Sequence, residues 1–345
     1  MKKILIASAL LAILFVSFSC AKTDEKPVEY NTYEFFCMDT FITLSGENIS
    51  KDDFREIEDL LISLEKSLSR TDEESEIYAL NHAKSLDVSD KTAYILLKVS
   101  EIAQNTGGAY NACMGKISEL WDITGKKYIP AEKEIQDSLI YCDHDGFSVS
   151  GNRVNKKYEE TVIDLGGSAK GYAAGKAIEK LKELGIDNAM ISLGGNIALT
   201  GHSRSREDVW RVGVKNPFYP DEIAGYVDFT DKIIAVSGDY ERYFVRDGKI
   251  YHHIFDPKTG YPCENGVKSV AVISENGLEA DALSTALFVM GKDKALEFYN
   301  SKIYDFEAVI FTSDGVVYLT DGLKNDFELI KEAKYKDNIS IRIAE

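Results

Sequence analysis

The spacing of apolar residues changes along the chain, and this change most constrains the fold. Before residue 209 the longest apolar patterns repeat at helical spacing, whereas from Val209 onward apolar residues form short runs separated by Gly, Asp and Asn. Helices and antiparallel-looking strands therefore mix without the regular alternation of a parallel βαβ fold. We expect an α+β fold.

Capping residues and periodicity locate the helices. Ser50 and Asp53 form a capping box at the start of one helix, a second spans Lys91–Asn105, and a third begins near Gly171 and ends at Gly185. A last helix is expected to start near Ala280. Strands are predicted at 189–193, 209–214, 224–229, 233–236, 250–255, 267–273, 306–311 and 316–319, with a strand end at 163–165 and a loop or hairpin at 141–153.

The N-terminus has the pattern of a bacterial export signal. Two lysines precede the apolar run 4–16, and the sequence turns polar after Cys20. Cys20 resembles the acylated cysteine of a lipoprotein, with ordinary cleavage nearby as the alternative. We expect a signal peptide at 1–19, a lipid-anchored tether at 20–32 and one domain at 33–345, exported and facing the periplasm or the cell exterior.

The formal net charge of −17 argues against nucleic acid as a partner. An anionic ligand would need a metal ion, local lysines or backbone N–H groups to bind here. Cys37, Cys113, Cys142 and Cys263 have no C-x-x-C spacing, so we expect no structural zinc. These four cysteines can pair in three ways, and the sequence does not choose among them.

Residues 251–262 combine His252 and His253 with an Asp-Pro corner and a Thr-Gly turn. Histidine ionises near neutrality, and such turns can present it to a ligand, as in a catalytic loop. The alternative is a strand that ends in a turn, with one histidine hydrogen-bonded and the other solvated.

Two further segments carry groups that suit an anion and a cation. Asp164–Tyr172 places glycines and Lys170 at a helix start, which favours phosphate, although a tight strand-to-helix turn explains it too. Asp281 and Thr285 lie one helical turn apart, and their oxygens suit Mg²⁺. The alternative is an acid that compensates the helix dipole. Arg242, in the segment 237–244, is a candidate phosphate partner or a member of a salt-bridged hairpin.

Taken together, these segments resemble the ApbE family of flavin transferases, which move FMN from FAD onto a threonine of a partner protein. The resemblance covers roughly residues 36–330. Its motifs occur in family order at 37–40, 69–81, 106–110, 164–172, 193–196, 237–242, 253–262 and 280–285. Asp39 and Asn111 depart from the residues most common in the family.

The resemblance implies an ApbE-like, T-fold-related architecture with mixed and antiparallel sheets. It implies FAD contacts by Met38, Ala109, Tyr110, Asn111, Asp164, Lys170 and Ile254. It also implies Mg²⁺ held by Asp281, Thr285 and backbone oxygen at Gly167, with Ser284 as a further candidate. FAD is then the substrate, and the acceptors are exported or membrane subunits of flavin-dependent redox complexes.

The expected reaction is attack of the acceptor threonine on the FMN-side phosphorus, with release of AMP. His253 is the candidate base, Asp256 its candidate orienting group and Asp281 the catalytic metal ligand. If water replaces threonine, the same site is an FAD pyrophosphatase. An FAD-binding lipoprotein without catalysis is a third interpretation, and simple retention of FAD would not require a metal and a base at the phosphates.

Overall fold

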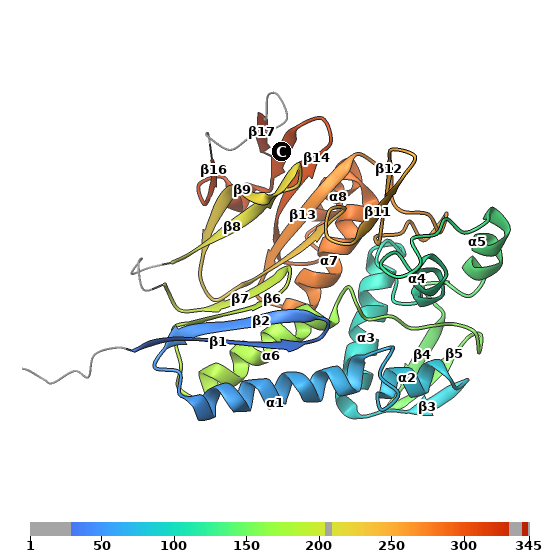
Figure 1. The fold of residues 1–345 in the computed structure, drawn as a ribbon, viewed down its shortest axis with the longest axis horizontal. Helices are drawn as coiled ribbons and strands as arrows, with labels where there is room; N and C mark the ends of the chain where they lie inside the picture. Colours follow the sequence, from blue (N-terminus) through green and yellow to red (C-terminus); the bar gives the residue numbers. More distant parts are fainter. Residues whose placement is uncertain (1–28, 204–208, 331–339, 344–345) are drawn as a thin grey trace, which may run out of the picture.

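The computed structural model describes residues 29–203, 209–330 and 340–343. Their largest element is a nine-stranded sheet in the order β1-β2-β6-β7-β10-β13-β14-β15-β17 (Figure 1). Its strands are β1 (Tyr30–Cys37), β2 (Thr40–Glu47), β6 (Ala189–Leu193), β7 (Asn196–Thr200), β10 (Ile233–Gly238), β13 (Val267–Ser274), β14 (Glu307–Thr312), β15 (Val316–Leu319) and β17 (Ser340–Ile343). Neighbours pair antiparallel except β15 and β17, which are parallel.

Both faces of this sheet are buried along its central strands. Successive side chains of a strand point to opposite faces, and along β13 Val270 and Val272 join the helical core while Ala271 and Ile273 join the core beneath a second sheet. That second sheet has the order β16-β9-β8, with β8 (Trp210–Asn216), β9 (Tyr219–Phe229) and β16 (Phe327–Leu329). The central strands are therefore apolar on both sides, and the helices that carry the polar residues discussed below rest on a rigid surface.

Helices cover the other face. α1 (Lys51–Leu68) and α6 (Ala169–Glu183) pack over β2 and β6, and α3 (Asp90–Asn105), α7 (Gly277–Met290) and α8 (Lys292–Asn300) pack over β13 and β14 (Figure 1). α6 and α7 come into backbone contact, because a Cβ built on Gly171 would lie 2.1 Å from the Gly277 carbonyl oxygen. This close crossing fixes the start of α6 against the first two turns of α7.

Shorter elements form a region beside the helices (Figure 1). They are α2 (Glu76–Asn81), α4 (Gly115–Trp121), α5 (Glu132–Leu139), the sheet β3 (Ser85–Asp87), β5 (Arg153–Lys156) and β4 (Phe147–Ser150), and the hairpin β11 (Tyr243–Arg246) and β12 (Lys249–His252). Lys156 is buried here, and its ammonium group donates to the carbonyls of Asn81, Glu159 and Thr161 at 2.8, 2.7 and 3.0 Å. The 3₁₀ helix η1 (Asp321–Leu323) lies elsewhere, against β14, where Leu323 joins the core beneath the second sheet.

The structure confirms the α+β class and the main predicted helices. The capping box at Ser50 is present, and α3 and α6 lie where periodicity placed them. Two predictions were wrong. The helix expected near Ala280 begins at Gly277, because the Asn276 side chain caps it, and α8 follows it. No strand forms at 163–165, since the side chain of Asn81 holds both backbone groups of Ile163.

The expected boundary of the tether also differs from the structure. Strand β1 begins at Tyr30, so residues 30–32 belong to the sheet. The predicted signal peptide and Cys20 lie outside the described residues. Within the described ranges, no helix has the length and apolar character needed to cross a membrane. The cysteines at 37, 113, 142 and 263 are buried and free.

Candidate functional site

A group of oxygen atoms surrounds the second and third turns of α7. The Oγ of Ser237, at the end of β10, lies 2.8 Å from Ser284 Oγ and 3.2 Å from Thr285 Oγ1. Ser284 Oγ also donates to the Asp281 carbonyl at 2.8 Å. Asp281 is only 6% exposed. The predicted metal ligands on α7, which are Asp281, Ser284 and Thr285, therefore lie together with the Ser237 hydroxyl group in one cluster.

The start of α6 supplies the opposite wall of this cluster. The Gly171 N–H donates to Asp281 Oδ2 at 2.9 Å, and Lys170 Nζ donates to the Gly166 carbonyl at 3.1 Å. Gly167 lies against the threonine hydroxyl, because a Cβ built on it would be 3.2 Å from Thr285 Oγ1. The structure thus brings together Gly167, Lys170, Asp281 and Thr285, which come from two segments far apart in the sequence.

The electrostatics of Asp281 suit a hard cation. Burial raises its pKa, while Lys170, the Gly171 N–H and the Asn196 side chain oppose that rise. The Asn196 Oδ1 atom is buried and has no hydrogen-bond partner among the described residues. A buried carboxylate, hydroxyl groups and an unpartnered amide oxygen form an all-oxygen donor set, which is the type that Mg²⁺ binds. The residues present therefore fit the predicted metal.

Aromatic packing fixes the position of the segment 251–262. The indole of Trp121 lies 5.8 Å from the Tyr251 ring and 5.9 Å from the Phe255 ring, measured between centroids, and its Nε1 donates to the Gly260 carbonyl at 2.8 Å. Gly260 has a φ of 70°, and a Cβ there would lie 2.6 Å from Ile135. Position 260 therefore needs glycine, because of its positive φ and because a Cβ has no space there. The aromatic packing and this turn hold the two preceding histidines in place.

The two histidines differ in what their ring nitrogens can do. His252 is 4% exposed, accepts from the Ile254 N–H through Nδ1 at 3.2 Å and donates through Nε2 to the Cys263 carbonyl at 3.0 Å. Both of its nitrogens are occupied. His253 is half-buried, and its Nδ1 lies 3.3 Å from the Arg242 carbonyl. A carbonyl only accepts, so Nδ1 carries the proton and Nε2 is the basic nitrogen.

Charges link His253 to the oxygen cluster. Burial, followed by the positive charge of Arg242, lowers the pKa of His253 well below 6.5, and Lys170 contributes in the same direction. Lys170 also acts on Asp281. His253 is therefore neutral at pH 7 and lies within electrostatic reach of the lysine that faces the carboxylate.

The residues predicted to contact FAD lie around the same core, with several differences from expectation. Met38 and Ala109 pack against the core that contains Tyr110. Tyr110 is only 3% exposed, and its hydroxyl donates to Ser168 at 2.9 Å, so it is a core residue with no open face for stacking. Both ends of the Asn111 amide are also occupied, by the Cys142 carbonyl at 2.7 Å and the Cys113 N–H at 2.8 Å.

Two residues of the histidine loop already have hydrogen-bond partners within that loop. Ile254 is predicted to offer backbone groups to the flavin, and in the structure its N–H donates to His252 while its carbonyl accepts from the Cys263 N–H at 2.9 Å. Asp256 was expected to orient His253, but its Oδ1 accepts the Lys258 N–H at 2.9 Å. The Arg242 carbonyl takes the place of that carboxylate at the ring.

Sequence reasoning assigned no role to three residues that complete the site. Asn196 and Ser237 contact the oxygen cluster, and Arg70 binds Asp164 at 3.0 Å. Each stands in a motif noted in the sequence, but long-range contacts define its role. Asp164 also accepts the Gly166 N–H at 2.8 Å, so its carboxylate supports the glycine loop.

The fold and this cluster define an α+β protein with a buried oxygen site next to a lysine and a neutral histidine. The chain belongs to the ApbE family, whose family model matches residues 38–310. It is 34% identical over 259 residues to the FAD:protein FMN transferase of Treponema pallidum, covering 70% of this chain and 72% of that protein. It is 29% identical over 317 residues to the Vibrio cholerae enzyme of the same name, covering 88% and 93%.

Solved structures share this fold. The ApbE protein of Thermotoga maritima superimposes with a TM-score of 0.79 at 31% identity, covering 86% of this chain and 99% of that one. The flavin transferase ApbE of Vibrio cholerae gives a TM-score of 0.78 at 27% identity, with the same coverage. Expectations of family and architecture from the sequence are thus confirmed.

Proposed function

We propose that this chain transfers FMN from FAD to a threonine hydroxyl of a partner protein, in a Mg²⁺-dependent reaction that releases AMP. The observation that carries the proposal is the buried Asp281 beside Thr285 and Ser237, with Lys170 acting on both Asp281 and His253. The names of the relatives support flavin transfer between FAD and a protein. The need for a metal, the acceptor threonine and the AMP product go beyond what these names state, and they belong to our proposal.

Asp281, Thr285 and the backbone oxygen of Gly167 would hold the metal, with Ser284 contributing its carbonyl oxygen. When bound, Mg²⁺ neutralises diphosphate charge and favours departure of an anionic leaving group. Lys170 contributes a second positive charge from the chain itself. In a protein of net charge −17, these local charges allow the anionic substrate to bind.

His253 would act as the base through Nε2. It accepts the threonine proton as the threonine oxygen bonds to the FMN-side phosphorus, and the bond from that phosphorus to the bridging oxygen breaks, so the bridging oxygen leaves with AMP. The low pKa of free His253 weakens it as a base. The negative charge of bound FAD opposes Arg242 and raises that pKa toward neutrality.

The acceptors fit the predicted cellular location. A lipid anchor at Cys20 would place the domain at a membrane surface, facing the periplasm or exterior, where exported or membrane subunits of flavin-dependent redox complexes are accessible. FAD remains the donor, and no nucleic acid partner is proposed because the chain is strongly acidic.

The test is incubation of the protein with FAD, Mg²⁺ and such a subunit, followed by denaturing electrophoresis. A fluorescent flavin band on the subunit is expected. His253→Gln and Asp281→Asn should reduce the band at least about 100-fold, as expected for the loss of a general base or a metal ligand. His82→Gln is the matched control, because the Nδ1 of His82 also lies against a backbone carbonyl. That carbonyl belongs to Tyr78 of α2, at 2.9 Å.

Two other outcomes would support the alternatives. Release of FMN and AMP with no labelled subunit would indicate a Mg²⁺-dependent FAD pyrophosphatase. Retention of FAD with neither product would indicate a binding protein. Full transfer by His253→Gln would exclude His253 as the base.

A further inference from the structure

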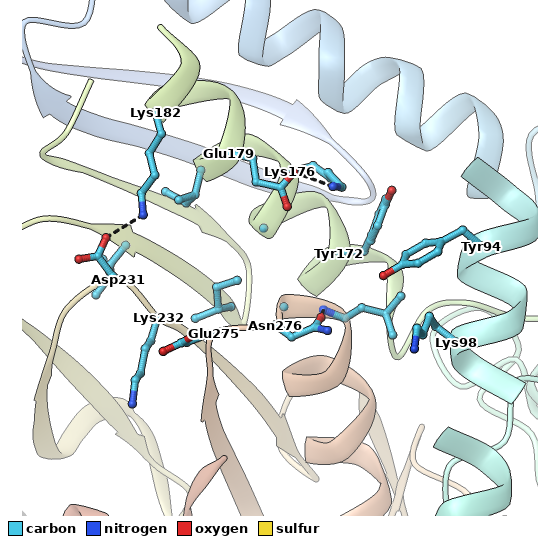
Figure 2. Close-up of a pocket in the computed structure, with 16 residues that line it drawn as sticks. Tyr94, Lys98, Tyr172, Lys176, Glu179, Lys182, Asp231, Lys232, Glu275 and Asn276 are labelled. Atoms are coloured by element: carbon cyan, nitrogen blue, oxygen red, sulfur yellow. Dashed lines mark hydrogen bonds and ion pairs between the residues drawn. The ribbon is translucent and has the colours of Figure 1, made fainter. Parts of the chain in front are cut away.

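A cavity of about 380 Å³ lies beside the start of α7, between α3, one side of α6 and β10 (Figure 2). Its volume falls in the range of small-molecule sites, which is about 300–1,000 Å³. None of its lining residues belongs to the predicted FAD or Mg²⁺ set. The cavity is therefore distinct from the oxygen cluster, although Gly277 in its wall contacts the α6 residue that holds Asp281.

Lysine side chains are concentrated in this cavity, in a protein that is otherwise acidic. Those lining it are Lys98, Lys176, Lys182 and Lys232, against the acids Glu179, Asp231 and Glu275. Lys176 and Lys182 have acidic partners within the cavity wall, at 2.6 and 2.9 Å (Figure 2). Lys98 pairs at 2.8 Å with an acid of its own helix that does not line the cavity. Because partly exposed ion pairs are weak, a phosphate can compete for these ammonium groups.

Two aromatic rings stand at one end of the same cavity (Figure 2). The rings of Tyr94 and Tyr172 have centroids 6.5 Å apart and an interplanar angle of 44°. Tyr94 is 47% exposed, and Lys176 Nζ lies 5.7 Å from the centre of the Tyr172 ring. An apolar planar group that stacks here would therefore be adjacent to a positive charge.

We propose that this cavity binds a nucleoside monophosphate, with the base against Tyr94 and Tyr172 and the phosphate at the cavity lysines, of which Lys98 and Lys176 flank the two rings (Figure 2). The ring surfaces and the lysines favour a ligand that combines a flat heterocycle with a compact anion. A free inorganic phosphate would use only the lysines. The proposal does not depend on flavin transfer, because it involves a different set of residues.

Gly175 offers a way to block the cavity without damaging the fold. It lines the cavity from α6, and a Cβ built on it would make only ordinary contacts, 3.5 Å from Ile233 Cδ1 and 3.9 Å from the Gly277 nitrogen. In Gly175→Leu the side chain would extend into the cavity. Helix propensity favours the change, so the variant is expected to fold.

The experiment is isothermal titration of the full-length protein with AMP in a Mg²⁺-free buffer, with and without saturating FAD, so that no AMP is released from FAD during the titration. Binding of one AMP is expected. The double variant Lys98→Gln/Lys176→Gln should bind at least about tenfold more weakly, because charge-assisted hydrogen bonds are lost. Lys133→Gln is the control, since this α5 lysine also has a helical acidic partner, at 2.7 Å, but lies outside the cavity.

A second pair of measurements separates nucleotide binding from anion binding. Tyr94→Leu should weaken AMP binding and leave the affinity for inorganic phosphate unchanged, and Gly175→Leu should abolish AMP binding at an unchanged or higher melting temperature. The proposal is overturned if AMP does not bind, if the cavity variants bind it like the wild type, or if inorganic phosphate binds as tightly as AMP. None of these outcomes depends on whether FMN is transferred.

Discussion

The crossing of α6 and α7 makes a sharp prediction at Gly171. In Gly171→Ala the new Cβ would lie 2.1 Å from the Gly277 carbonyl oxygen and 2.5 Å from the Asp281 Cβ, so the two helices must separate. Such overpacking costs about 1–3 kcal/mol. The shift also weakens the hydrogen bond from the Gly171 N–H to Asp281, and hydrogen bonds to charged groups contribute about 1.5–3 kcal/mol.

Alanine recovers part of this loss, because it is favoured over glycine within a helix by about 0.5–1 kcal/mol. The expected net loss in the free energy of unfolding is about 2–5 kcal/mol for Gly171→Ala. The matched control is Gly175→Ala, one turn further along α6, where the nearest atom would be 3.5 Å away. That variant should be unchanged or more stable by up to about 1 kcal/mol.

Urea denaturation of both variants, followed by circular dichroism, measures the difference. Calorimetric Mg²⁺ titration then reports on Asp281, and Gly171→Ala should bind the ion more weakly than Gly175→Ala does. If Gly171→Ala were as stable as Gly175→Ala, the close helix crossing would not exist as described. If it were unstable but bound Mg²⁺ normally, Asp281 would not be the metal ligand.

Three further predictions concern individual side chains. Asn196→Ala removes an amide that contacts Asp281, so Mg²⁺ affinity by calorimetry should fall about tenfold; unchanged affinity would refute that role. Burial lowers the pKa of His252, so the unfolded state takes up a proton at a higher pH than the folded state does. The stability present above pH 6.5 is therefore lost as the pH falls, by at most about 1.4 kcal/mol per pH unit. His252→Asn should flatten this dependence in urea titrations between pH 7 and 5, and an equally steep curve would count against it. Lys156→Met leaves three backbone carbonyls without their donor and should cost about 2–4 kcal/mol of unfolding free energy, whereas a loss below about 1 kcal/mol would show that water replaces the ammonium group.

Local signals in the sequence were sufficient for much of the fold. α1 follows from apolar periodicity and the Ser50 cap, and α3 from apolar periodicity, because capping and burial of an apolar stripe act within a few residues. The hairpin of β1 and β2 was not predicted. Its two turn residues, Met38 and Asp39, have φ values of 54° and 57° without the glycine that usually indicates such a turn.

Part of the site was also predictable from local signals in the sequence. Asp281 and Thr285 share a helix face, so their spacing alone suggested a cation site. The contact of Asp281 with Gly171 joins residues 110 positions apart, and Asn196 reaches the same carboxylate from another strand. Ile254 and Asp256 make hydrogen bonds within their own loop, which a motif does not reveal.

The most direct test of the central claim is the stoichiometry of the reaction. The full-length protein is incubated with FAD, Mg²⁺ and an acceptor subunit of a redox complex, and AMP and flavin-modified acceptor are quantified by chromatography and intact mass. Our account predicts one AMP for each acceptor that gains FMN on a threonine, with no reaction after chelation of Mg²⁺ or in Asp281→Asn. Modification of the acceptor at full rate in that variant, or AMP release without a modified acceptor, would contradict it.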